Sequence, residues 1–134
     1  MKLKIFEINT VFQTVPLIKD LILKGKINLT FPEYRDFFHM CGLIEKETAV
    51  INDMRFQIAG KYALKDDNGE FIIDNDHYTF ADDSVMNMFL KEIQELNITE
   101  INLEAEKLNI GSEKLNINDC PQIFDAVLTI FQVF

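Results

Sequence analysis

The sequence predicts a single α+β domain over residues 1–134, in which a mixed or mostly antiparallel sheet of roughly four to six strands packs with three or four helices. Two kinds of apolar spacing support this class. Some runs have every second residue apolar, which is typical of strands, and others have apolar residues three and four apart, which is typical of helices. The length suits one domain, and a hydrophobic content of 48% is enough for a core without disulfide bonds.

The first predicted elements are a strand, a helix and a second strand. Residues 2–8 contain alternating apolar positions and predict an opening strand. Thr14 can cap a helix over residues 15–24, because a threonine oxygen can accept a free backbone N–H at a helix start. Gly25 is a natural stop for this helix. Residues 26–30 alternate again and predict a short strand.

A second helix is predicted to begin at a capping box. The Thr30 hydroxyl can accept the backbone N–H of Glu33, whose carboxylate can reach back to the backbone N–H of Thr30. This helix is expected to end at Gly42. Residues 49–63 are predicted to be mostly extended, because their larger apolar residues occupy alternate positions with few exceptions.

The second half of the chain begins with a hairpin signal. The Asp-Asp-Asn-Gly sequence of residues 66–69 predicts a tight turn, because an Asn-Gly pair readily adopts positive φ angles. Residues 70–74 then form the predicted return strand, and residues 77–80 are a candidate for another.

The remaining elements are a helix, a strand and an ambiguous C-terminal segment. Asp82 or Asp83 can cap a helix over residues 84–97, whose apolar residues recur at helical spacing. Residues 98–110 predict a strand with a break near its end. Residues 119–134 favour a buried helix, because their polar residues share one stripe, although β-branched and aromatic residues leave a core strand as the alternative.

The charge of the chain is divided unevenly. Residues 1–66 hold ten Lys/Arg and eight Asp/Glu, whereas residues 67–134 hold three Lys and fourteen Asp/Glu, for a net charge of −9. Nucleic acids and anionic membranes are therefore unsuitable partners, because phosphate contacts need clustered Lys/Arg. Two cysteines and no apparent signal peptide indicate a cytoplasmic location.

No catalytic signature is present in the sequence. It contains no phosphate-binding glycine loop, nucleophile elbow or zinc-protease motif, and no cofactor is predicted. The cluster Asp74, Asp76 and His77 is the most metal-like group, but it lacks the register of a calcium loop, and a polar turn explains it more simply. His39 and Cys41 lie two apart on a predicted helix, so they point to different faces and do not form a local nucleophile pair.

The acidic residues of the second half are the candidate partner-binding surface. They form two groups: one in the predicted hairpin region and the start of the following helix, the other along one face of the predicted strand. The candidates are Asp66, Asp67, Glu70, Asp74, Asp76, Asp82, Asp83, Glu100, Glu104 and Glu106. Such a surface can steer a basic protein towards the chain, although a surface that only confers solubility is the competing explanation.

These observations favour a non-catalytic acidic protein that binds and neutralises a basic partner protein. The most natural case is an immunity protein that blocks a cognate nuclease toxin in bacterial competition, with carboxylates pairing with Lys/Arg in the toxin's substrate cleft. Two alternatives stay open. One is a phage-encoded inhibitor of a nucleic-acid-binding defence complex, and the other is a small enzyme or ligand-binding module with an unrecognised site.

Overall fold

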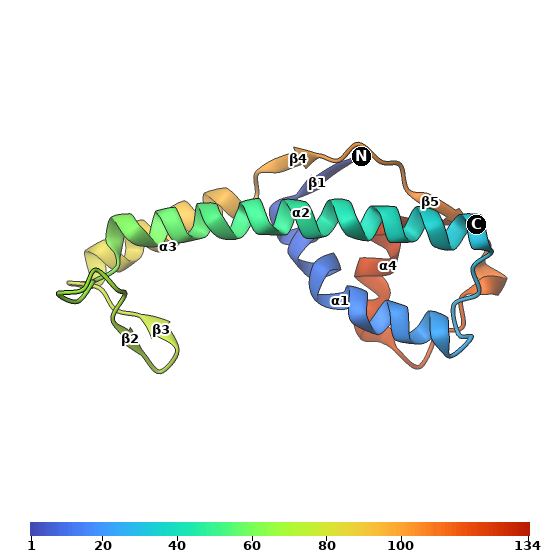
Figure 1. Cartoon of the computed structure of the whole chain (residues 1–134), viewed down its shortest axis with the longest axis horizontal. Helices are drawn as coiled ribbons and strands as arrows, with labels where there is room; N and C mark the ends of the chain where they lie inside the picture. Colours follow the sequence, from blue (N-terminus) through green and yellow to red (C-terminus); the bar gives the residue numbers. More distant parts are fainter. The chain divides into compact units, whose positions relative to one another are not determined.

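The structure is a computed structural model that describes residues 1–134. The chain forms two compact units. The first unit comprises Met1–Thr48 and Glu100–Phe134, and the second comprises Ala49–Thr99. Helix α2 (Phe31–Tyr62) contributes residues to both units (Figure 1). Whether residues 1–134 behave as one domain stays a prediction.

The α+β class is confirmed, with four α-helices and three small sheets. The sheets are smaller than the sequence analysis expects, because each has two strands of only two or three residues. Much of the chain expected to be extended is helical. None of the helices has both the length and the apolar character needed to cross a bilayer.

The first unit begins with strand β1 (Lys2–Lys4), which pairs antiparallel with β4 (Glu100–Asn102) and places Leu3 opposite Ile101. Helix α1 (Ile5–Leu23) follows at once, so the strand predicted over residues 2–8 is wrong beyond Lys4. The reason is the spacing of the isoleucines and valine at positions 5, 8 and 11. These residues lie three apart, and all are buried on the same side of the helix.

The N-terminal boundary predicted for this helix is also wrong, whereas its C-terminal boundary is confirmed. Thr14 lies inside α1 and donates its hydroxyl to the carbonyl of Thr10, so it does not act as a cap. Gly25 has a φ of +76°, the left-handed conformation that glycine adopts most easily after a helix.

The C-terminal part of the first unit contains both structures that the sequence left open. Helix α4 (Phe124–Ile130) runs directly into strand β6 (Phe131–Val133), which pairs in parallel with β5 (Leu108–Ile110). Two 3₁₀ turns, Ser112–Lys114 and Pro121–Ile123, connect β5 to α4.

Two predicted strands of this unit are shorter in the structure. The strand expected over residues 98–110 is present only as β4 and β5, with an irregular segment between them. The strand expected over residues 26–30 is reduced to an isolated bridge between Ile27 and Leu115.

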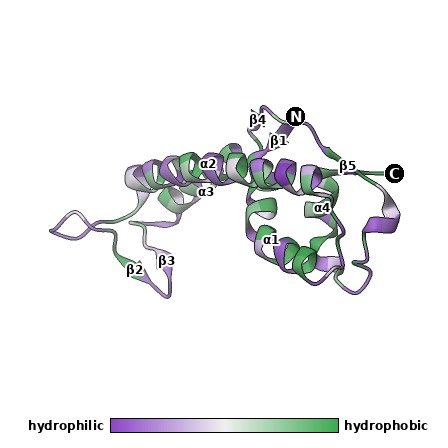
Figure 2. Ribbon diagram, turned by 45° about the vertical axis from the view of Figure 1, so that its right-hand side comes forward, coloured by the Kyte–Doolittle hydropathy of each residue, from purple (hydrophilic) through white to green (hydrophobic).

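The core of the first unit is formed by α1, α4, β6 and the start of α2. Phe37 of α2 stacks on Phe131 of β6 with a ring-centre distance of 6.1 Å, and both side chains are buried. The ribbons of α1 and α4 are largely hydrophobic, whereas α2 alternates between hydrophobic and hydrophilic residues (Figure 2). This unit holds 18 of the 21 buried apolar side chains of the chain.

The second unit is built on the end of α2 and on helix α3 (Asp83–Asn97). The two helices run antiparallel, because Tyr62 donates a 2.6 Å hydrogen bond to Glu92 and Arg55 donates one of 3.2 Å to Asn97. The predicted stop at Gly42 is wrong, and so is the extended segment over residues 49–63, since α2 continues unbroken to Tyr62.

Two turns connect these helices. The turn predicted at residues 66–69 is confirmed, with a φ of +79° at Gly69 and an isolated bridge between Lys65 and Phe71. A second hairpin follows, in which β2 (Ile73–Asp74) pairs with β3 (His77–Tyr78). The predicted cap of α3 is also confirmed, because Asp82 accepts the backbone N–H of Val85 at 2.9 Å.

Candidate functional site

The ten candidate carboxylates are distributed over the two units. Seven of them, between Asp66 and Asp83, belong to the second unit, whereas Glu100, Glu104 and Glu106 belong to the first. Each group has to be assessed within its own unit. None of the ten forms an ion pair with a lysine, arginine or histidine.

Two carboxylates of the second unit stabilise the local backbone. Asp66 accepts the backbone N–H groups of Asn68 at 2.9 Å and of Glu70 at 3.1 Å, which fixes the first turn. Asp82 caps α3 through the N–H of Val85. These local hydrogen bonds are a sufficient reason for the presence of both residues.

The other five carboxylates of the second unit are exposed and have no protein partner: Asp67, Glu70, Asp74, Asp76 and Asp83. Asp76 lies at the tip of the second hairpin, where it and Asn75 have positive φ angles of 63° and 51°. No lysine or arginine occurs between Lys65 and Lys91. The hairpins therefore carry a concentrated negative charge that this part of the chain does not neutralise.

The three carboxylates of the first unit do not share a strand face, which corrects the sequence-based expectation. Strand β4 ends at Asn102, so only Glu100 belongs to it. Glu104 and Glu106 lie in the irregular segment that follows. The N-terminal ammonium of Met1 holds this segment by donating to the carbonyls of Leu103 at 2.8 Å and Ala105 at 2.7 Å.

Glu104 and Glu106 face a cavity of about 440 Å³ together with Asp36 and His39 of α2. The two glutamates are exposed and alternate with Leu103 and Ala105, which are buried and half-buried. Three carboxylates therefore contribute negative charge to this cavity, whose lining also includes Lys107.

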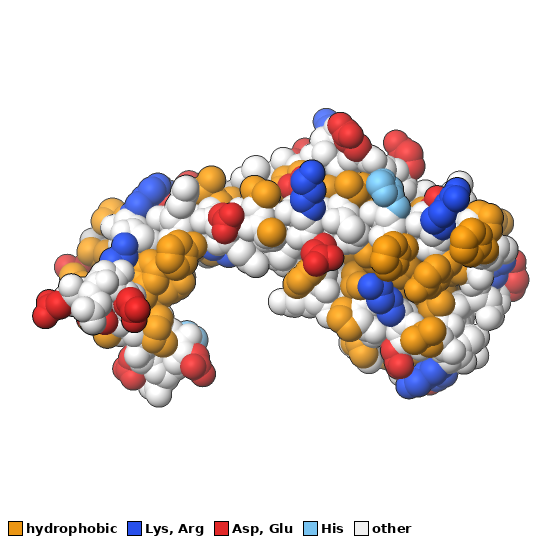
Figure 3. Space-filling view, viewed as in Figure 1, with side chains coloured by type: hydrophobic (Ala, Val, Ile, Leu, Met, Phe, Trp, Pro, Cys, Tyr) orange, Lys and Arg blue, Asp and Glu red, His pale blue; other side chains and the backbone are white.

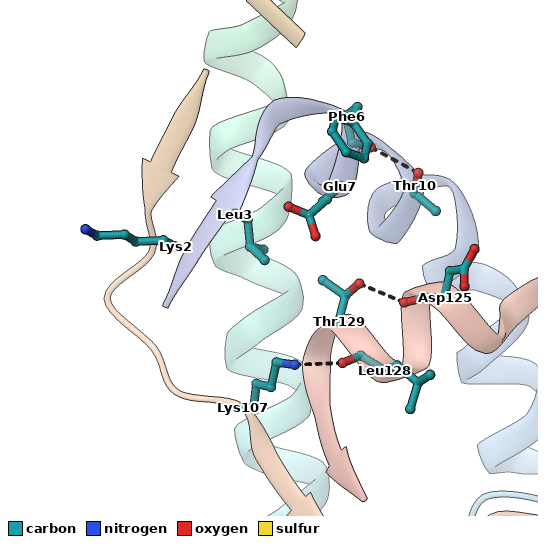
Figure 4. A pocket seen from close by; sticks show the side chains of 9 residues that line it. All are labelled: Lys2, Leu3, Phe6, Glu7, Thr10, Lys107, Asp125, Leu128 and Thr129. Carbon is teal, nitrogen blue, oxygen red and sulfur yellow. Dashed lines mark hydrogen bonds between the residues drawn. The ribbon is translucent and has the colours of Figure 1, made fainter. Parts of the chain in front are cut away.

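A second cavity of the first unit, of about 420 Å³, lies between β1, α1 and α4 (Figure 4). The Glu7 carboxylate points into it, but one of its oxygens accepts the backbone N–H of Lys4 at 2.9 Å. The hydroxyl of Thr129 donates to the carbonyl of Asp125, and the Lys107 ammonium donates to the carbonyl of Leu128. These polar groups are engaged by the backbone and form no nucleophile–base pair.

The residues considered for metal binding and nucleophilic chemistry do not assemble. Asp74, Asp76 and His77 share a hairpin, but the structure holds no group of three or more side chains placed to bind a metal ion. Cys41 is half-buried in α2, and this burial raises the pKa of its thiol above the ordinary value. A raised pKa disfavours the reactive thiolate.

The second unit also carries an exposed apolar surface that the sequence pattern does not predict. Four aromatic rings contact one another in series: Phe56, Phe71, Tyr78 and Phe89 have successive ring-centre distances of 5.2, 5.1 and 5.9 Å. Phe56 is nevertheless 62% exposed. The position of Phe56 is the missed signal: the alternating pattern of residues 49–63 predicts an extended segment, whereas Phe56 lies on helix α2 and stays exposed there.

No family model matches the chain, and neither a curated protein nor a solved structure matches it.

Proposed function

We propose that this chain is a non-catalytic protein that binds and neutralises a basic partner protein, with a nuclease toxin of bacterial competition as the most natural case. The observation that carries the proposal is the second unit's hairpin region, where five exposed carboxylates form no ion pair with a lysine or arginine. Neighbouring carboxylates without a cationic partner repel one another, and a basic partner protein would relieve this repulsion.

The mechanism would be steric and electrostatic. A nuclease binds its substrate through lysines and arginines that contact phosphates. Carboxylates on an exposed turn can occupy the same cationic groups, and arginine–carboxylate pairs can be bidentate. The chain would thus keep nucleic acid out of the cleft without any chemical step of its own.

The proposal requires that the partner be basic and that the carboxylates speed association. Capture with the tagged full-length chain from cells that encode it should recover such a partner, and stoichiometric addition of the chain should block the partner's nuclease activity. Neutralising the hairpin group by Asp67→Asn, Glu70→Gln, Asp74→Asn and Asp76→Asn should lower the association rate about tenfold at low salt. The difference should shrink at 0.5 M salt, because exposed charges are then screened.

A control variant is Glu45→Gln with Asp53→Asn, which removes two exposed carboxylates from α2 outside both candidate groups and is compared with the pair Asp74→Asn and Asp76→Asn. Its association rate should stay close to that of the unaltered chain. Charge reversal of Glu100, Glu104 and Glu106 to lysine tests the first unit's group in the same way. A partner that is not basic, or association rates that respond neither to salt nor to any of these substitutions, would contradict the proposal.

A further inference from the structure

The second unit has an apolar face that its own residues leave open. We define the aromatic face as Phe56, Phe71, Ile73 and Tyr78. Phe71 forms an isolated bridge with Lys65, and Ile73 begins β2 two residues later; side chains two apart in an extended chain point the same way. Ile73 pairs directly with Tyr78 in the hairpin, and Phe71 contacts both Phe56 and Tyr78. These four side chains therefore form one continuous surface.

This face is unusually exposed for its composition. Phe56 is 62% and Ile73 is 53% exposed, while Phe71 and Tyr78 are half-buried. The second unit has only three buried side chains, Ile51, Ile58 and Ala59, so it offers little to cover the face. Contiguous exposed apolar side chains with a polar rim are typical of protein-binding sites.

The chemistry of the rim indicates what the partner must carry. Acidic turns adjoin the hairpin residues of this face in the sequence: Asp67 and Glu70 precede Phe71, and Asp74 and Asp76 lie between Ile73 and Tyr78. Figure 3 shows hydrophobic side chains gathered at the end of α2 and on the hairpins, with carboxylates at the hairpin tips. The Lys65 ammonium lies over the Phe71 ring, 5.1 Å from its centre, and forms no ion pair with these carboxylates.

We propose that the aromatic face is the docking site for an apolar side chain of the basic partner, flanked by lysines or arginines that reach the two acidic turns. This inference rests on the proposed function, because the basic character of the partner comes from that proposal. It adds that affinity comes from an apolar anchor in the centre and that charge acts at the rim, the usual division within protein interfaces.

A second copy of the chain is a poorer occupant of this face. The second unit holds ten Asp/Glu against four Lys/Arg, so two copies would bring like charges together around the apolar centre. Like charges at an interface oppose association, whereas a basic partner makes the same rim favourable.

The test uses the full-length chain and a synthetic probe peptide. The probe has a central tryptophan and leucine flanked on each side by three arginines. The chain contains no tryptophan, so the indole fluorescence of the mixture reports the peptide alone. Binding at the aromatic face should shift this emission to shorter wavelength, because the indole leaves water. A second peptide carries glutamates in place of the arginines. A third has serines in place of the apolar pair and so contains no indole; added as a competitor, it should not displace the arginine probe from the aromatic face.

The decisive variant is Phe56→Ser with Ile73→Ser, compared with Val50→Ser plus Met54→Ser. The control residues are 59% and 44% exposed and lie on a different side of α2 from Phe56, given a rotation of about 100° per residue. We expect the first variant to bind the arginine probe at least tenfold more weakly and the control to bind within twofold of the unaltered chain. Ile73→Ser alone, which leaves the Phe56–Phe71 contact in place, should also weaken binding with unchanged circular dichroism.

Three results would contradict the proposed docking site. The arginine probe shows no blue shift with the chain, the two double variants bind the probe equally well, or the chain forms a dimer that Phe56→Ser with Ile73→Ser dissociates. A natural basic partner that binds this variant as tightly as the unaltered chain would also overturn it, while leaving the proposed function intact. Binding of the glutamate peptide as tightly as the arginine probe would instead contradict the proposed function itself.

Discussion

At the scale of single residues, carboxylates of the same charge have different roles in this chain. Asp66 and Asp82 accept backbone N–H groups and stabilise a turn and a helix start, whereas Asp74 and Asp76 are exposed without partners. Their substitution should therefore have different consequences. Removing Asp66 or Asp82 would lower stability, so only the carboxylates without a backbone partner give clean tests of binding.

Glu33 gives a prediction for the pH dependence of stability. Its carboxylate accepts the backbone N–H of Thr30 at 2.9 Å and the Lys114 ammonium at 2.9 Å, and these bonds lower its pKa, the Thr30 bond most strongly. A pKa lowered by folding stabilises the protein above the ordinary pKa of a glutamate, and this stabilisation is lost as the pH falls through the lowered value. Glu33→Ala should cost about 1 kcal/mol at pH 7, the usual cost of losing a helix cap.

Urea denaturation at pH 7, 5 and 3 would measure this effect. The difference between the unaltered chain and Glu33→Ala should shrink towards pH 3, as the carboxylate becomes protonated in the folded state. Lys114→Met is the matched control, because it removes the ion pair and leaves the capping bond to Thr30 in place. It should cost less than Glu33→Ala, since ion pairs of this exposure contribute roughly 0–1 kcal/mol. A difference that does not change with pH would contradict the assignment.

At the scale of secondary-structure elements, several local signals in the sequence are confirmed, whereas the cap predicted at Thr14 and the stop predicted at Gly42 are wrong. The capping box at Thr30, the cap at Asp82 and the turns at Gly25 and Gly69 are all present, because each depends on hydrogen bonds or φ angles within a few residues. Residues 49–63 were wrongly predicted to be extended. Their apolar positions fit both an alternating and a helical pattern, and burial of Ile51 and Ile58 on one face of α2 decides between them.

Gly42 provides a test of the continuity of α2. It is exposed within the helix, its φ is not positive, and a Cβ atom placed there would meet nothing within 4 Å. Gly42→Ala should therefore raise the free energy of unfolding by about 0.5–1 kcal/mol, because glycine loses more backbone entropy than alanine in a helix. Thermal unfolding followed by circular dichroism would measure the gain.

Gly25→Ala is the matched control for this substitution. It also has open space around its Cβ position, but its φ of +76° is strained for alanine. It should lower stability by roughly 1 kcal/mol. If Gly42→Ala were destabilising as well, the helix would have to be interrupted at that position, and the sequence-based stop at Gly42 would be correct after all.

At the scale of the whole molecule, the sequence predicts the excess of acidic residues but not where their side chains lie in the structure. Composition alone shows the excess of Asp/Glu after residue 66. The apolar centre of the proposed docking site was hidden, because it depends on Phe56 of α2 meeting Phe71 of the hairpin. Contacts between residues this far apart in sequence depend on tertiary packing, which propensity and periodicity do not encode.

The uneven burial of the two units predicts an uneven local stability. The first unit holds 18 buried apolar side chains and the second only three, so the second should open more readily. The hydrogen-bonded amides of Leu64 and Ile72 should exchange with solvent at least tenfold faster than that of Ile18, which lies in the buried helix α1. Hydrogen exchange followed by NMR at pH 7 would measure these rates.

Binding of the arginine probe extends this prediction to function. A ligand that binds only the folded second unit stabilises it by mass action, so the probe at saturation should slow exchange at Leu64 and Ile72 and leave Ile18 unchanged. Equal protection of all three amides in the free chain would mean that residues 1–134 unfold as one cooperative domain. The exposed aromatic face would then be as stable as the core of the first unit, despite its few buried side chains.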